Sequence, residues 1–249
     1  MSHRRIPAFV LTLFVLMAAD AVAQPQTLSH AQALSNVQAR PNVVTGDSLV
    51  YGKFSLIFAS NDTGFSRVTR QNMINVFFTV YPLELERFNK NALTKVGFFI
   101  DTAYRAVAET GNGTSRFNPD WMKRYPQDVD VITHEVMHVV QDYKDYEPGW
   151  LTEGIADYAR YVYGVNNKGA GWTLPDCKPG QSYKNAYRVT ARFLLWVEKN
   201  KYKKIVDDLD KAMRDGTYTP ELWVKLTGKT VDGLWDEYAK DPVLELHYK

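Results

Sequence analysis

The residues with the clearest capacity for chemistry lie in the segment His134-Glu135-Val136-Met137-His138. Two histidines four residues apart on a helix lie on one face, roughly 6 Å apart along the axis, so both imidazoles can reach one metal ion. Glu135 flanks the same face, where a carboxylate can take a proton from a water molecule on the metal. The segment therefore predicts a catalytic zinc site, with His134 and His138 as ligands and Glu135 as general base.

The third protein ligand is expected from the next helix. Glu153 is suited to this role and would leave one position open for water or substrate, as a catalytic zinc requires. Asp157 lies four residues later on the same face, where it can accept the free ring N–H of a liganding histidine. Asp142, Asp145 and Glu147 remain alternative third ligands, although the chain would have to turn back sharply for any of them to reach the ion.

Other zinc-site patterns fit the sequence less well. One class has a third histidine six residues after the second, but Lys144 occupies that position. The same class has a glycine three residues after the second histidine, and here that residue is Gln141. The ligand set His-His-Glu is therefore preferred.

The apolar pattern of the two helices indicates which faces pack on the core. The stripe of the first helix comprises Ile132, Val136, Val139 and Tyr143, and that of the second comprises Leu151, Ile155, Tyr158 and Val162. His134 and His138 lie opposite the first stripe, so we expect them to face solvent or a cleft. The small residues Gly154, Ala156 and Ala159 favour close approach of another backbone to the second helix.

The order of predicted elements indicates an α+β protein, with strands in the first half and helices in the second. Strands are expected at 54–60 and 96–101, and 106–109 and 114–118 flank a Gly-Asn-Gly hairpin signal. Pro82 should end or kink a helix that begins at 68, with a further helical stretch to about 89. Later helices are expected at 127–143, 148–163, 182–200, 220–228 and from 230, with 164–181 irregular. The predicted metal-binding helix lies where strands give way to helices.

The N-terminus has the pattern of a secretory signal peptide. Arg4 and Arg5 precede an apolar run that is too short to cross a bilayer, and Ala21 and Ala23 supply the small residues for cleavage before Gln24. We therefore expect a signal peptide at 1–23, a flexible leader at 24–45 and one catalytic domain at 46–249. The protein should be exported, to the extracellular space or a bacterial periplasm, and no segment should span a membrane.

Charge and cysteine content narrow the possible partners. Loss of residues 1–23 removes two arginines and one aspartate, so the formal charge falls from +2 to +1. This near-neutral balance favours neither nucleic acid nor an anionic membrane as a partner. Cys177 is the only cysteine, so the chain forms no internal disulfide, and its context does not suggest a nucleophile.

Four segments resemble motifs of the plant basic secretory proteins and occur in that family's order. They are HEVMHVVQ at 134–141, GWLTEGIADYAR at 149–160, YRVTARFL at 187–194 and GKTVDGLWDEY at 228–238. The resemblance extends from about residue 49 to 242 and implies a zincin-like fold and a zinc-dependent peptidase. A barely basic chain with one cysteine favours a non-plant member, so a defence role is not carried over.

The resemblance also suggests an oxyanion donor. Tyr187 lies within the family-like YRVTARFL block and is the preferred candidate, with Tyr183 and Tyr158 as competitors and a core aromatic role as the alternative. The segment 114–118 is a candidate edge strand for pairing with an extended peptide substrate.

The main prediction is a secreted zinc metallopeptidase that acts on peptides or proteins. Two rival functions remain open. The protein could be a binding or defence protein with a non-catalytic zinc site, or a metal-dependent amidase acting on cell-wall material. The intact Glu135 argues against a degenerate enzyme.

Overall fold

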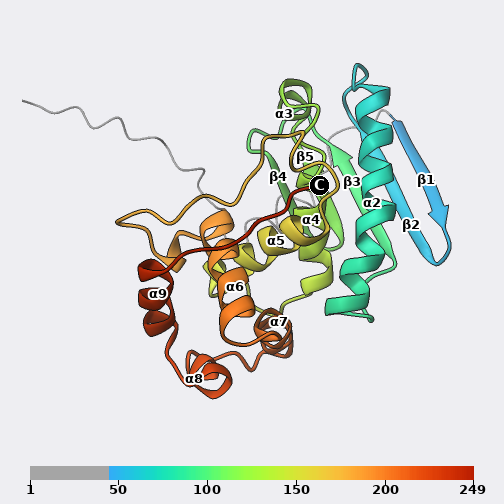
Figure 1. Ribbon diagram of the computed structural model, residues 1–249. Coiled ribbons are helices and arrows are strands. Elements are labelled where there is room, and N and C mark those ends of the chain that lie inside the picture. Colours follow the sequence, from blue (N-terminus) through green and yellow to red (C-terminus); the bar gives the residue numbers. More distant parts are fainter. Residues whose placement is uncertain (1–44) are drawn as a thin grey trace, which may run out of the picture.

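The first half of the protein is built on a five-stranded mixed sheet, seen in a computed structural model that describes residues 45–249 (Figure 1). The strands are β1 (Thr45–Tyr51), β2 (Phe54–Ser60), β3 (Lys95–Ile100), β4 (Ala108–Gly111) and β5 (Thr114–Phe117). Their spatial order is β1-β2-β3-β5-β4, with β1/β2 and β4/β5 antiparallel and the two central pairings parallel. The predicted strand at 54–60 and the hairpin about Gly111 and Gly113 are both present.

The edge of the sheet near the predicted metal site is formed by β4, not by β5. The prediction that 114–118 is an edge strand is therefore wrong. Because β5 pairs in parallel with β3, the hairpin places β4 outside it. β4 also packs against the helix that carries the two histidines.

Helix α2 (Arg67–Phe88) covers one face of the sheet (Figure 1). Its Tyr81 and Phe77 rings make edge contacts with Phe54 of β2 and Phe98 of β3, at centroid distances of 5.8 and 5.5 Å. Pro82 does not end the helix, because the buried residues on both sides of it remain packed in the core. Of the two predicted effects of Pro82, an end or a kink, the structure excludes the end, and the helix runs on to Phe88, close to the predicted limit of about 89. Tertiary packing therefore outweighs the lost backbone hydrogen bond.

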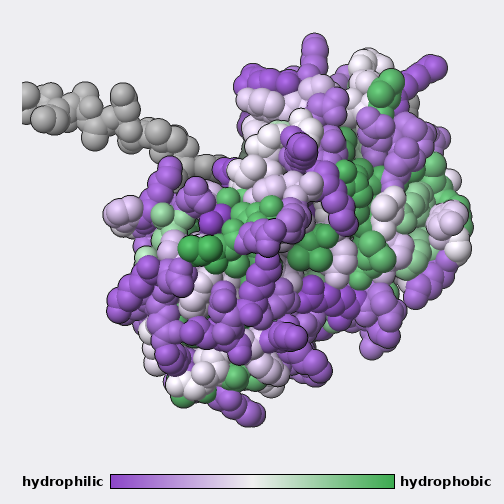
Figure 2. Space-filling view, viewed as in Figure 1, coloured by the Kyte–Doolittle hydropathy of each residue, from purple (hydrophilic) through white to green (hydrophobic). Residues whose placement is uncertain are grey.

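Helices dominate the second half, as predicted, and the α+β class is confirmed. They are α3 (Pro119–Arg124), α4 (Val131–Gln141), α5 (Gly149–Tyr163), the short η1 (Tyr183–Asn185), α6 (Tyr187–Asn200), α7 (Ile205–Asp215), α8 (Glu221–Thr227) and α9 (Val231–Lys240). In Figure 1, α4 and α5 lie between the sheet side of the molecule and helices α6 to α9. Figure 2 shows hydrophobic residues beside α2 and a mostly hydrophilic surface over the later helices.

Helices α5 and α6 approach each other closely, as the small residues predicted. A Cβ atom added to Gly154 would lie 2.3 Å from Cγ2 and 2.7 Å from Cβ of Thr190 on α6. Only glycine fits this crossing without displacement of one helix. The residue next to Gly154 is Glu153, so the packing of α6 also fixes where that carboxylate lies.

Helix α6 begins later than predicted. Ser182 caps η1 instead, and Asn185 hydrogen-bonds back to the Ser182 backbone N–H. The chain then passes through Ala186 and Tyr187, both with positive φ, before α6 continues. Such backbone angles are unfavourable for residues other than glycine, so local sequence signals could not reveal this break.

The C-terminal tail, residues 241–249, runs back across the helical half (Figure 1). Trp196 of α6 donates its indole N–H to the carbonyl of Asp241, at 2.9 Å. The Tyr248 hydroxyl accepts the backbone N–H of Leu174, and the Lys249 carbonyl accepts that of Lys168. The tail therefore fastens the irregular segment 164–181 to the body of the protein.

The predicted signal peptide and leader lie outside the described residues, apart from Thr45, which begins β1. Between residues 45 and 249, no helix has both the length and the apolar character needed to cross a membrane. Cys177 is half-buried, and burial raises the pKa of its thiol, which fits an unreactive side chain.

Candidate metal centre and active site

Helix α4 carries the histidine pair and is buried on nearly every side. Asp130 precedes its first residue and accepts backbone N–H groups from Val165 and Asn166, so its start is tied to the segment after α5. His134 is 8% exposed and lines a cleft together with His138. Of the two predicted environments, solvent or a cleft, the structure shows the cleft.

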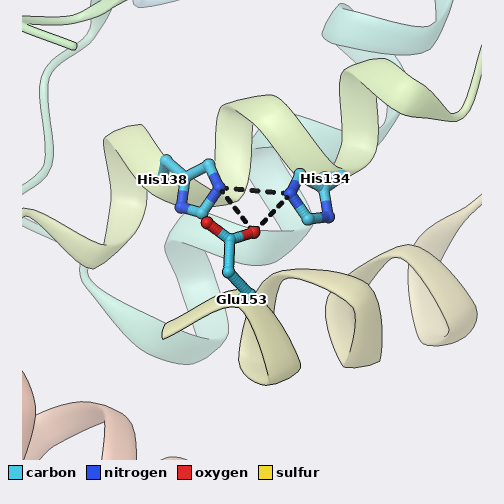
Figure 3. Close-up of side chains that lie close together, drawn as sticks. All are labelled: His134, His138 and Glu153. Atoms are coloured by element: carbon cyan, nitrogen blue, oxygen red, sulfur yellow. Dashed lines mark hydrogen bonds and ion pairs between the residues drawn. The ribbon is translucent and has the colours of Figure 1, made fainter. Parts of the chain in front are cut away.

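The predicted ligand atoms converge between α4 and α5. Figure 3 shows both imidazoles pointing from one helix toward Glu153 on the other. The two Nε2 atoms are 3.2 Å apart, and Oε2 of Glu153 lies 3.2 Å from Nε2 of His134 and 3.7 Å from that of His138. Among the His, Cys, Asp and Glu side chains of residues 45–249, these three form a cluster able to share one metal ion, because their ligand atoms all lie within 4.8 Å of one another.

This arrangement fits a tetrahedral zinc ion. Two nitrogens bound at 2.0–2.1 Å to a tetrahedral ion lie roughly 3.3 Å apart, close to the 3.2 Å separation of the histidine Nε2 atoms. Imidazole and carboxylate are ligands that zinc accepts. The spacing and the donor set therefore both suit zinc.

The opposite ring nitrogens are held by oxygen acceptors. Nδ1 of His134 lies 2.8 Å from Oδ1 of Asp157, as predicted, and Nδ1 of His138 lies 2.7 Å from Oε1 of Gln141. The Gln141 amide in turn donates to the carbonyl of Thr152, at 2.9 Å. With protons on both Nδ1 atoms, the Nε2 lone pairs are free to face a metal ion.

The alternative third ligands do not join this group. Asp145 and Glu147 accept backbone N–H groups of Glu147 and Gly149, so both carboxylates stabilise the turn before α5. Asp142 ends α4 in a left-handed conformation and lines the cleft away from the ligand group. The turn places Glu153, not these residues, opposite the histidines.

The Glu135 carboxylate is 4% exposed and is held by the edge strand. The Thr110 hydroxyl of β4 donates to its Oε2, at 2.7 Å. Burial raises the pKa of Glu135, although the charges of His134 and His138 oppose that rise. A carboxylate with a raised pKa binds a proton more readily, which suits a general base.

The Tyr187 ring stacks on that of His134, with centroids 6.1 Å apart and an interplanar angle of 18°. Ala186 before it has φ 60° and ψ −171°, a region almost restricted to glycine, and Tyr187 has φ 49°. Strained backbone of this kind persists only where surrounding packing imposes it, and it is concentrated at functional sites. Burial, reinforced by the Glu153 and Glu135 charges, raises the pKa of Tyr187, so its hydroxyl remains a hydrogen-bond donor.

The competing tyrosines hydrogen-bond to carboxylates outside the ligand group. The Tyr183 hydroxyl donates to Asp232 of α9, at 2.8 Å. The Tyr158 hydroxyl donates to Glu198 and accepts from Arg87. Neither residue lines the cleft that holds the ligand group.

Sequence reasoning missed three polar residues of the site. Gln141 is one helical turn after His138, so its spacing was a usable signal. Thr110 and Tyr146, whose hydroxyl donates to Oε1 of Glu153, reach the site only through tertiary packing. Arg192 and Trp196, by contrast, hold neighbouring chain segments, because Arg192 pairs with Asp176 and Trp196 donates to the carbonyl of Asp241.

Burial and charge oppose each other within the ligand group. Burial alone would lower the pKa of His134, but Asp157 and Glu153 outweigh it and hold that pKa well above its ordinary value. Burial would likewise raise the pKa of Glu153, but the charges of His138 and His134 lower it to about 2. Without a metal, the group therefore holds a proton on imidazole opposite a carboxylate.

The fold and site define an α+β protein with a candidate metal centre between two successive helices beside a sheet edge. The family model described as peptidase of plants and bacteria, BSP, matches residues 54–238. The chain therefore belongs to the BSP family, which confirms the resemblance seen in its sequence motifs.

Solved structures to which this chain is similar include M1 zinc metallopeptidases of Deinococcus radiodurans. One, bound to a Tyr-Ser-Ala substrate, is 13% identical with a TM-score of 0.49, and the match covers 82% of this chain and 53% of that one. An aminopeptidase N family protein from Idiomarina loihiensis is 11% identical with a TM-score of 0.38, and the match covers 81% of this chain and 42% of that one. The chain spans about half the length of these structures. No curated protein matches it.

Proposed function

We propose that this protein is an exported zinc metallopeptidase that hydrolyses peptide bonds. The observation that carries the proposal is the convergence of His134, His138 and Glu153, with both outward ring nitrogens held by oxygen acceptors. Membership of a peptidase family supports the same conclusion. Export is inferred from the signal-like pattern of residues 1–23.

In the proposed mechanism, His134, His138 and Glu153 hold zinc, and Asp157 and Gln141 orient the two imidazoles. Bound zinc supplies Lewis-acid activation of water and of the scissile carbonyl. Glu135 takes the proton of the attacking water and delivers it to the leaving amine. Thr110 holds one oxygen of Glu135 and leaves the other for this proton transfer.

Tyr187 is the proposed donor to the oxyanion that develops on the scissile carbonyl. Its contact with the His134 ring and its strained backbone support this role. Tyr146 is less suited, because its hydroxyl already donates to Glu153.

The proposed substrate is an extended peptide that adds to the outer edge of β4, which no other strand of residues 45–249 pairs with. This strand lies beside α4, and its residues line the same cleft as the ligand group. The cleft has a volume of about 1370 Å³, above the range typical of sites for small ligands. Backbone hydrogen bonds from a sheet edge would hold the peptide whatever its side chains.

The proposal is tested by comparing the wild-type protein with a Glu135→Gln variant on casein, synthetic peptides and peptidoglycan. We expect both proteins to bind one zinc ion and only the wild type to cleave casein and peptides. Equal cleavage by both would remove Glu135 from the mechanism. Consumption of peptidoglycan alone would identify a cell-wall amidase, and zinc binding without any hydrolysis would identify a binding protein.

A further inference from the structure

Arginines and aromatic rings form part of the cleft lining outside the ligand group. Here α3, α5, α6 and the segment between the last two contribute a continuous surface, which we call the arginine wall. It comprises Trp121, Arg124, Arg160, Trp172 and Arg188, all of which line the cleft.

Contacts between these residues hold the wall together. The Trp121 indole donates to Asp128, at 2.9 Å, and the other carboxylate oxygen of Asp128 accepts from the Arg160 guanidinium. That guanidinium lies 4.6 Å from the centre of the Trp172 ring. Arg188 donates a hydrogen bond to the backbone carbonyl of Thr173, the residue after Trp172, at 3.4 Å. The wall is therefore one surface built from separate elements.

Two arginines of the wall carry positive charge that no ion pair within the described residues neutralises. Asp128 balances Arg160, but no carboxylate of residues 45–249 forms an ion pair with Arg124 or Arg188, and both side chains are exposed. No other arginine or lysine of the described chain lines the cleft, and Asp142, a lining residue at the C-terminal end of α4, lies at the other end of this helix from Asp128. The cleft is therefore electrically asymmetric along its length.

We propose that the arginine wall binds carboxylates of the substrate, so that the protein selects peptides with acidic residues on one side of the scissile bond. The inference rests on the proposed peptidase function and gives it a substrate class. A guanidinium can bind a carboxylate through two parallel hydrogen bonds, which favours aspartate and glutamate over their amides. The Trp121 and Tyr125 rings, tilted by 47° with centroids 4.4 Å apart, add apolar surface beside Arg124.

The test measures peptide binding to the zinc-loaded full chain carrying Glu135→Gln, which leaves peptides intact. Two labelled peptides share one sequence except that three glutamates at one end of the first are glutamines in the second. A mirrored pair carries the same difference at the other end. In one pair, the glutamate peptide should bind roughly fivefold more tightly at about 20 mM salt, and this advantage should shrink at about 300 mM.

The arginines are tested by adding Arg124→Gln and Arg188→Gln together, which should bring the affinity ratio of the two peptides close to one. Lys123→Gln is the matched control, because Lys123 is an exposed neighbour on α3 that does not line the cleft. It should leave the ratio unchanged. Thermal unfolding shows whether each variant remains folded.

Equal affinity within both peptide pairs would overturn the inference, as would an advantage that survives loss of both arginines. These failures are distinct from failure of the proposed function. Wild-type protein that cleaves casein, combined with equal binding in both pairs, would refute the arginine wall alone. An arginine-dependent preference without any hydrolysis would refute the peptidase and retain the wall as an acidic-peptide site.

Discussion

At the scale of single residues, the site depends on which histidine nitrogens remain free. Asp157 and Gln141 occupy the two Nδ1 atoms, so both Nε2 atoms face Glu153. These acceptors fix the tautomer and orientation of each ring before a metal ion arrives.

The first prediction concerns Asp157. Replacement by alanine removes the acceptor from His134 and should weaken zinc binding about 10- to 100-fold, as is typical for such outer partners. Asp157→Asn keeps an oxygen acceptor, so its zinc affinity should lie between that of Asp157→Ala and that of the wild type. Competition with a chelator measures the zinc affinities. Asp236→Ala is the control, because Asp236 is exposed and is not one of the metal-binding residues. Unchanged affinity in Asp157→Ala would show that the contact does not orient the ligand.

The second prediction concerns the pH dependence of stability in the metal-free protein. The pKa of His134 is raised above 6.5, so its interaction stabilises the fold below that pH and is lost as pH rises through the folded value. The pKa of Glu153 falls from 4.5 to about 2, so its contribution is present above 4.5 and is lost as pH falls toward 2. In the chelator-treated protein, the stabilisation of the fold by His134 and Glu153 should therefore be greatest between pH 4.5 and 6.5.

Denaturant unfolding of the metal-free protein from below pH 4.5 to well above pH 6.5 checks the second prediction. His134→Gln should remove the loss of stability on the alkaline side. If the variant and the parent respond identically to pH, the proton on His134 is not coupled to folding.

At the scale of elements, the sequence predicted the helices of the site well because each has a periodic apolar stripe. The helix at 148–163 and the pairing of the histidines with Glu153 followed from local pattern and spacing. The edge role of β4 and the break at Ala186 did not, because strand order and backbone strain are imposed by contacts between distant segments. For the same reason, Thr110 and Tyr146 could not be assigned to the site.

The third prediction concerns the crossing of α5 and α6. Gly154→Ala would bring a methyl group against Thr190, and overpacking of this kind costs about 1–3 kcal/mol of unfolding free energy. Because Glu153 is adjacent, zinc affinity should fall as well. Adding Thr190→Ser removes the nearest methyl group and should restore part of the lost stability and part of the lost zinc affinity. Denaturant unfolding measures the first, and chelator competition measures the second. Wild-type stability in Gly154→Ala would mean that the crossing is looser than described.

At the scale of the whole molecule, the C-terminal tail links regions that are far apart in sequence. It is hydrogen-bonded to the segment 164–181, which contributes Gly169 to Trp172 to the cleft. The tail therefore holds one wall of the cleft without touching the ligand group.

The fourth prediction concerns removal of residues 244–249. The loss of the Tyr248 and Lys249 contacts should loosen this wall and raise the KM for peptides several-fold, while the zinc content stays the same. Tyr248→Phe keeps the ring contact with Tyr161 but loses the hydrogen bond from Leu174, so a smaller effect is expected. Unaltered KM in the truncated protein would show that the cleft wall does not depend on the tail.

The most direct test of the central claim is metal analysis with X-ray absorption spectroscopy of the purified mature protein. We predict one zinc ion per chain, with two imidazole nitrogens at about 2.0–2.1 Å and carboxylate oxygen in its shell. The His138→Ala and Glu153→Ala variants should lose or greatly weaken zinc binding. A wild-type protein that binds no zinc, or a zinc shell unchanged in both variants, would contradict the account.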